Sequence, residues 1–186
     1  ITPQPLSLEL RGGRNVFHVG PFSLDLFGGR LSFGPASLAF DPQARRFSGL
    51  SSLSLDGLDI SRIPLNPAQF RLRGEARGDF ARVEISPGRI AAQGEGVADI
   101  FGGKVIVKDV SIVDPFQKGR AFVLNADLVD LDLKEITDSV PFGEVTGIIR
   151  GEIRDLSFSY GQPERFNLRL ESVKREGVPQ TFSLKA

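Results

Sequence analysis

Cysteine, methionine and tryptophan are all missing from this chain of 186 residues, which has one histidine and one tyrosine. Without cysteine the chain forms neither a disulfide bond nor a thiolate metal site. Its 23 basic residues balance 23 acidic ones, so the formal net charge is +0. A protein with no net field attracts polyanions poorly, and we expect no nucleic-acid partner.

The sequence shows no charged segment followed by an apolar one at its start, and it has no long apolar run. It begins at Ile1 and contains no methionine, which indicates a piece of a longer or processed protein. A membrane-spanning helix needs ~20 apolar residues, and no run approaches that length. We therefore expect membrane attachment, if the protein has it, to come from segments outside this sequence.

Residues suited to enzyme chemistry are scarce. His18 is the only imidazole, and neither a Gly-x-Ser-x-Gly nor a His-Glu-x-x-His motif occurs. Asp127, Asp130 and Asp132 suggest a calcium site, but they lack the EF-hand spacing and fit a solvated strand edge or a helix cap. We predict no enzyme, no catalytic or metal site and no cofactor.

What the chain does contain is an internal repeat. Phe27-Gly28-Gly29-Arg30-Leu31 returns as Phe101-Gly102-Gly103-Lys104-Val105, and further matches follow in the same order: Leu55–Ile63 with Leu128–Ile136, and Arg73–Arg77 with Arg150–Arg154. We interpret a single domain over 1–186 with two copies of one β-rich unit, about 14–86 and 88–160, and C-terminal strands over 161–186. The glycine pair fits a tight turn or bulge between strands.

Most segments alternate apolar and polar residues, as Phe166-Asn167-Leu168-Arg169-Leu170 does, which is typical of half-buried strands. The sequence predicts an all-β, antiparallel protein of about 12 to 16 strands. Short helical segments are expected at Leu58–Ile63, before Pro64, and after Asp132, which would cap a turn carrying Leu133, Ile136 and Val140.

One face of these strands is apolar, and no long amphipathic helix is present to cover it. The sheet must then become a sandwich, a closed barrel or a strongly curved, U-shaped groove, and a single bulge would reverse the faces after it. In the groove, an open apolar trough would be a binding surface. The residues expected on the inner face are Leu24, Leu26, Leu31, Phe33, Leu38, Phe40, Leu53, Leu55, Phe122, Leu124, Leu156, Phe158, Phe166, Leu168, Leu170, Phe182 and Leu184.

The sequence resembles a known family. The Phe-Gly-Gly strands, the segment from Leu128 to Ile136, the run Val145–Gly151 and the closing stretch Gly177–Ala186 are similar to the C-terminal region of AsmA-like envelope proteins of the TamB and YdbH type. The resemblance implies a taco-shaped β-groove in the periplasm, within a protein anchored in the inner membrane, that carries phospholipid acyl chains between membranes or supports the outer membrane. Its partners would be acyl-chain lipids and neighbouring repeats of the same protein. The alternative is a structural β-repeat without a ligand.

Overall fold

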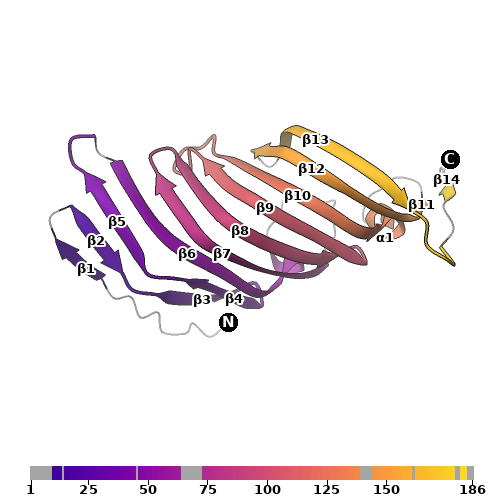
Figure 1. Ribbon diagram of the computed structural model, residues 1–186, viewed down its shortest axis with the longest axis horizontal. Coiled ribbons are helices and arrows are strands. Elements are labelled where there is room, and N and C mark those ends of the chain that lie inside the picture. Colours follow the sequence, from indigo (N-terminus) through magenta and orange to yellow (C-terminus); the bar gives the residue numbers. More distant parts are fainter. Residues whose placement is uncertain are drawn as a thin grey trace.

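The structure is a computed structural model that describes residues 10–13, 15–44, 46–63, 73–138, 144–160, 162–178 and 181–183. Within these residues the chain forms strands β1 to β14, one 3₁₀ turn and one short α-helix. Twelve of the strands make one antiparallel sheet, whose long strands bend along their length (Figure 1). The expected all-β, antiparallel class is confirmed.

The elements follow one another along the chain. Their bounds are β1 Leu10–Gly13, β2 Val16–Val19, β3 Phe22–Leu26, β4 Gly29–Phe33, β5 Ala36–Asp41, β6 Arg46–Asp59, η1 Ile60–Arg62, β7 Gly74–Ser86, β8 Arg89–Ile100, β9 Gly103–Val113, β10 Ala121–Asp132, α1 Leu133–Asp138, β11 Glu144–Thr146, β12 Ile148–Ser159, β13 Gln162–Val173 and β14 Thr181–Ser183. β11 and β14 pair with each other in a separate two-stranded sheet.

The large sheet is open. Its strands follow the order β1-β2-β5-β6-β7-β8-β9-β10-β12-β13, and β3 and β4 attach beside β6. β1 and β13 end this path and do not pair with each other, so in the described part of the chain the sheet neither closes into a barrel nor stacks on a second large sheet. Of the three arrangements left open by the sequence, the sandwich and the closed barrel are therefore not adopted.

Two proline positions break long strands near the N-terminus. Gly20-Pro21 separates β2 from β3, and Gly34-Pro35 separates β4 from β5. Proline has no N–H to donate to a strand ladder, so the pairing partner changes at these points. β4 pairs with β3 and β6, whereas β5 pairs with β2 and β6.

The two Phe-Gly-Gly sequences form equivalent hairpins. The central residues have positive φ in both turns, 52° and 82° at Phe27-Gly28 and 51° and 67° at Phe101-Gly102, which is the type I′ geometry of a two-residue hairpin. The third residue is glycine because a Cβ on Gly103 would clash with the carbonyl oxygens of Val129 and Asp130. The predicted tight turn at the glycine pair is confirmed.

Each hairpin lies against a short helical segment capped by an aspartate. Asp59 accepts a hydrogen bond from the Ser61 amide at the start of η1, and Asp132 accepts one from the Lys134 amide at the start of α1. The Asp59 and Asp132 amides donate to the carbonyl oxygens of Phe27 and Phe101. Both predicted helical segments exist, although Leu58 belongs to β6 and Val140 lies outside the described residues.

Few apolar residues are buried, and three of them form a cluster next to α1. Leu128, Leu131 and Ile149 form this cluster, and Leu133 and Ile136 of α1 pack against it. No apolar side chain in the described residues is less than 2% exposed. The helix thus covers one end of the sheet, and the remaining strands depend on neighbours within a single layer.

The glycine of the second hairpin gives a test of this arrangement. We expect Gly103→Ala to destabilise the protein by about 1–3 kcal/mol, because the new Cβ overpacks against the backbone of β10. Gly13→Ala is the matched control, since a Cβ there meets nothing within 4 Å. Urea unfolding followed by circular dichroism measures both; equal stability of the two variants would contradict the close approach.

Candidate functional site

The strand register brings the predicted apolar residues onto one face of the sheet. In the N-terminal part, Leu24 lies opposite Leu31, and Leu31 lies opposite Leu55 in the next strand. Phe22 and Phe33 form the neighbouring pair, with ring centroids 4.7 Å apart in a stacked arrangement. Cross-strand neighbours point to the same side, so these side chains form continuous rows. We call this side the apolar face.

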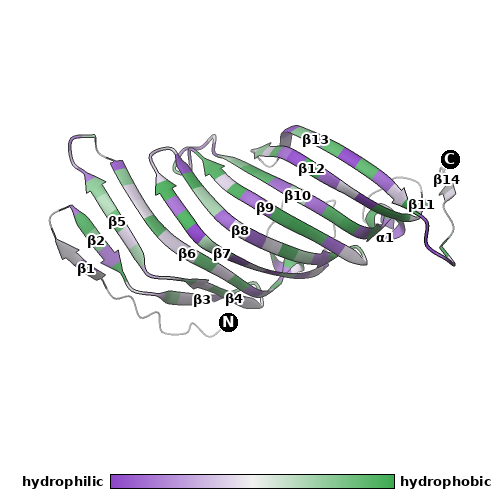
Figure 2. Ribbon diagram, viewed as in Figure 1, coloured by the Kyte–Doolittle hydropathy of each residue, from purple (hydrophilic) through white to green (hydrophobic). Residues whose placement is uncertain are grey.

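The same face continues through the C-terminal strands. Phe122 and Leu124 of β10 lie opposite Phe158 and Leu156 of β12. Ile153 of β12 in turn lies opposite Leu168 of β13. Figure 2 shows the resulting alternation of apolar and polar residues along the strands.

Bulges interrupt the ladders without reversing the apolar face. Between β10 and β12, three steps from Ile153 to Leu156 lie opposite two steps from Ala126 to Leu124. Asp155, with φ of 53°, takes up the extra residue. The alternation therefore resumes in phase after the bulge, and Ile153 and Leu156 both lie on the apolar face.

Most of the residues predicted for the inner face share this side by register or by alternation within their strand. They are Leu24, Leu26, Leu31, Phe33, Leu38, Phe40, Leu53, Leu55, Phe122, Leu124, Leu156, Phe158, Phe166, Leu168 and Leu170. Phe182 belongs instead to β14, in the separate two-stranded sheet, so it is not part of this face. Leu184 lies outside the described residues.

The sequence analysis missed the central strands of the face. Val105 and Val107 of β9 belong to it, but they stand in the uninterrupted run Val105-Ile106-Val107, where alternation gives no face. β7 and β8 contribute small residues, with Gly78 directly opposite Gly96. The feature that marks these strands is the pairing of two glycines, and it can be recognised only once the strand register is known.

Phe80 fills the space above that glycine pair. Its side chain is 5% exposed, and Cβ atoms built on Gly78 and Gly96 would lie 3.2 and 3.4 Å from its ring. An aromatic ring over glycines covers backbone that has no side chain of its own. At this point in the middle of the sheet, the Phe80 side chain covers the apolar face.

Elsewhere the apolar face is partly open to solvent. Leu26 is 42% exposed and Phe122 42%, and on the edge strand β13 Phe166, Leu168 and Leu170 are 52%, 48% and 47% exposed. These residues are large and apolar, and their exposure places apolar area in contact with water along both parts of the sheet. Apolar area of this kind marks a candidate binding surface.

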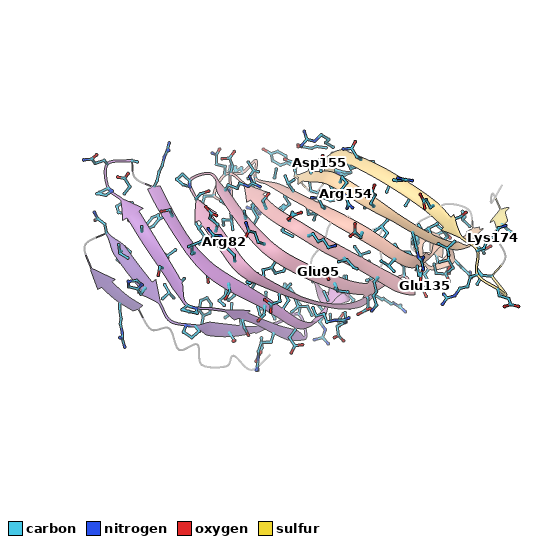
Figure 3. The ribbon with its side chains drawn as sticks, in the orientation of Figure 1. Arg82, Glu95, Glu135, Arg154, Asp155 and Lys174 are labelled. Carbon is cyan, nitrogen blue, oxygen red and sulfur yellow. The ribbon has the colours of Figure 1, made fainter. Side chains whose placement is uncertain are left out.

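The opposite side of the sheet, which we call the polar face, carries a chain of ion pairs across four strands. Lys108 of β9 lies between Glu95 of β8, at 3.8 Å, and Asp127 of β10, at 3.0 Å. Asp127 also binds Arg154 of β12 at 2.8 Å, and Arg154 binds Glu152. Figure 3 labels Glu95 and Arg154 on β8 and β12. The pairs of Lys108 with Glu95 and Asp127, and of Asp127 with Arg154, bridge neighbouring strands, whereas Glu152 and Arg154 both belong to β12.

The ion pairs shift the pKa values of their members. The hydrogen bonds from Lys108 and Arg154 hold the pKa of Asp127 below its usual value, and the bond from Asp127 raises the pKa of Lys108. Lys104 and Arg77 lower the pKa of Asp99 in the same way. Asp127 and Asp99 therefore stay charged to lower pH than a free carboxyl does, and each is bound to two cations.

The residues considered for chemistry make local polar contacts. The exposed His18 ring contacts the Ser37 hydroxyl at 3.1 Å on the polar face. Asp130 accepts a hydrogen bond from Arg150 at 2.6 Å, and Asp132 caps α1. No three histidine, aspartate or glutamate side chains converge as metal ligands in the described ranges. None of the described helices has the length and apolar character needed to cross a membrane.

Comparisons with models of known protein families, with curated proteins and with solved structures find no match to this chain. The geometry of the two faces is therefore the basis for the functional proposal.

The ion pairs of Asp127 predict a pH-dependent stability. A carboxyl with a lowered folded pKa stabilises the protein above its unfolded pKa of about 4, and the effect disappears as the pH falls through the folded value. We expect Asp127→Asn to lose about 0.5–1 kcal/mol at pH 7. At pH 3 the gap to the unchanged protein should narrow.

Urea unfolding at the two pH values measures this difference. Asp79→Asn is the control, because Asp79 lies on the same exposed face and makes no ion pair in the described part of the chain. A constant gap for Asp127→Asn at pH 7 and pH 3 would contradict the role of the carboxylate.

Proposed function

We propose that the apolar face binds the acyl chains of lipids and that the protein carries them between membranes. The observation that supports this is one continuous apolar face on an open sheet, with large side chains such as Leu26, Phe122 and Phe166 between 42% and 52% exposed. Burying each CH₂ of an acyl chain contributes about 0.8 kcal/mol. The face therefore holds a chain by area alone.

The composition of the apolar face suits movement as well as binding. Leucine, phenylalanine and valine offer no hydrogen bonds, so sliding along the rows breaks no directional contact. The charged headgroup stays in water at the rim, where it needs no pocket of its own. We expect binding to be broad across headgroups and to depend on acyl length.

We further propose that the sheet consists of two copies of one unit curved into a U-shaped groove. The two Phe-Gly-Gly hairpins, with matching φ values and matching aspartate caps, support the repeat. This architecture is the one that the resemblance to AsmA-like envelope proteins implies. On that basis we place the protein in the periplasm, as a segment that joins neighbouring repeats, within a longer protein anchored in the inner membrane.

A structural β-repeat without a ligand is the second candidate. Phe80 over the glycine pair and the cluster of Leu128, Leu131 and Ile149 under α1 favour it, because in these places the protein fills its own apolar face. The two candidates differ in one observable. Lipid that copurifies with the protein and is identified by mass spectrometry supports the first and opposes the second.

A pair of leucines on opposite faces provides a matched test. Leu26 lies on the apolar face and is 42% exposed, whereas Leu50 lies on the polar face and is 45% exposed. We expect Leu26→Asp and Phe122→Asp each to reduce crosslinking to a photoreactive phosphatidylcholine about tenfold, the equivalent of roughly two methylene contacts. Leu50→Asp should leave crosslinking unchanged.

Circular dichroism confirms that each variant is folded before it is compared. Crosslinking that falls equally in the Leu50→Asp control would show that the apolar face is not the binding surface. No crosslinking in the unchanged protein would favour the structural repeat.

A further inference from the structure

β13 is a long strand at the edge of the sheet. It spans Gln162–Val173 and pairs only with β12 among the described strands. Eleven of its twelve residues are exposed, and Phe166, Leu168 and Leu170 are about half exposed on the apolar face. An edge strand of this length, with no second partner among the described strands and with three exposed apolar side chains, is a template for another strand.

The sequence of β13 is complementary to itself in one antiparallel register. With Leu168 opposite Leu168 of a second strand, Phe166 lies opposite Leu170 and Arg165 lies opposite Glu171, and each of these pairs occurs twice. Opposite charges and apolar pairs directly across a ladder are the arrangements that stabilise antiparallel strands. A twofold axis through Leu168 generates such a contact from two identical chains.

The neighbouring registers are poorer. A shift of the partner strand by two residues in one direction sets Arg165 opposite Arg169, and a shift by two in the other sets Arg169 opposite itself. Like charges directly opposite each other destabilise a ladder. A shift by one residue pairs the apolar face of one copy with the polar face of the other, which exposes both.

We propose that two copies of this protein associate through β13 in the register centred on Leu168. The twofold axis then stands perpendicular to the sheet, so the apolar faces of both copies lie on one side and form one continuous face. β1, at the other edge, is a poorer partner because it offers four residues, two of them glycine. This pairing extends beyond the proposed lipid binding and does not depend on it.

The absence of cysteine makes the register measurable with single substitutions. In the proposed pair the two Cβ atoms at position 168 lie about 5 Å apart, close enough for a disulfide after a small adjustment. The two positions 166 lie about 14 Å apart along the strands. We therefore expect mild oxidation to produce disulfide-linked dimers of Leu168→Cys and no disulfide-linked dimers of Phe166→Cys. An equal mixture of Phe166→Cys and Leu170→Cys should form disulfide-linked dimers.

A charge exchange tests the same register without a crosslink. Light scattering of the unchanged protein should show a mass that rises with concentration toward twice 20.2 kDa. Arg165→Glu should raise the dissociation constant at least tenfold, because it sets two pairs of like charges opposite each other. Combining it with Glu171→Arg should restore association.

Three results would overturn the proposal. They are a mass that stays monomeric at millimolar protein, equal oxidation of Leu168→Cys and Phe166→Cys, and failure of the charge exchange to recover association in a double variant that circular dichroism finds folded. A dimer that forms without lipid binding would uphold this inference and oppose the proposed function, so the two fail separately.

Discussion

The hydrogen-bond ladder between adjacent strands is the constraint on which the rest of the structure depends. A single layer has no second sheet to pack against, so each strand is held by its neighbours in the sheet and by the side chains directly across from it. The ion pairs around Asp127 act on one side of the ladder, and the leucine and phenylalanine rows act on the other. Both depend on the register, which the hairpins and bulges set.

The Phe-Gly-Gly hairpins are where the register is fixed most tightly. Positive φ at both central residues selects a two-residue loop, and the loop length determines which residues face each other. The third residue, Gly29 or Gly103, lets the backbone of β6 or β10 approach where a side chain would obstruct it. The carbonyl oxygen of Phe27 or Phe101 accepts a hydrogen bond from the amide of the aspartate that caps the helical segment. This bond orients the chain where it leaves the sheet.

Strict alternation made much of the apolar face predictable. In Phe166-Asn167-Leu168-Arg169-Leu170 the polarity of each residue predicts the face it lies on. In β13 the apolar residues of this segment do lie on one face. In the run Val105-Ile106-Val107 the residues on both faces are apolar, so the sequence does not predict which of them lie on the apolar face. Bulge residues with positive φ, such as Asp155, were not predicted, because aspartate is equally common in ordinary turns.

The shape of the sheet could not be read from local patterns for a different reason. Alternation states that a face is apolar, and it does not state what lies across from that face. A sandwich, a barrel and an open sheet share the same strands and turns. The ion pairs from Glu95 to Arg154 were likewise invisible, since they join residues on four strands whose alignment depends on the bulges between them.

The nearest-neighbour construction has a consequence for how such a protein changes in evolution. A hairpin inserted or lost between two strands alters one pair of ladders and leaves all others as they were, whereas the same change in a protein with a central core would disturb every layer. Selection can therefore vary the number of strands in the sheet almost independently of the stability of the protein. The width of the sheet can therefore grow or shrink by one hairpin at a time.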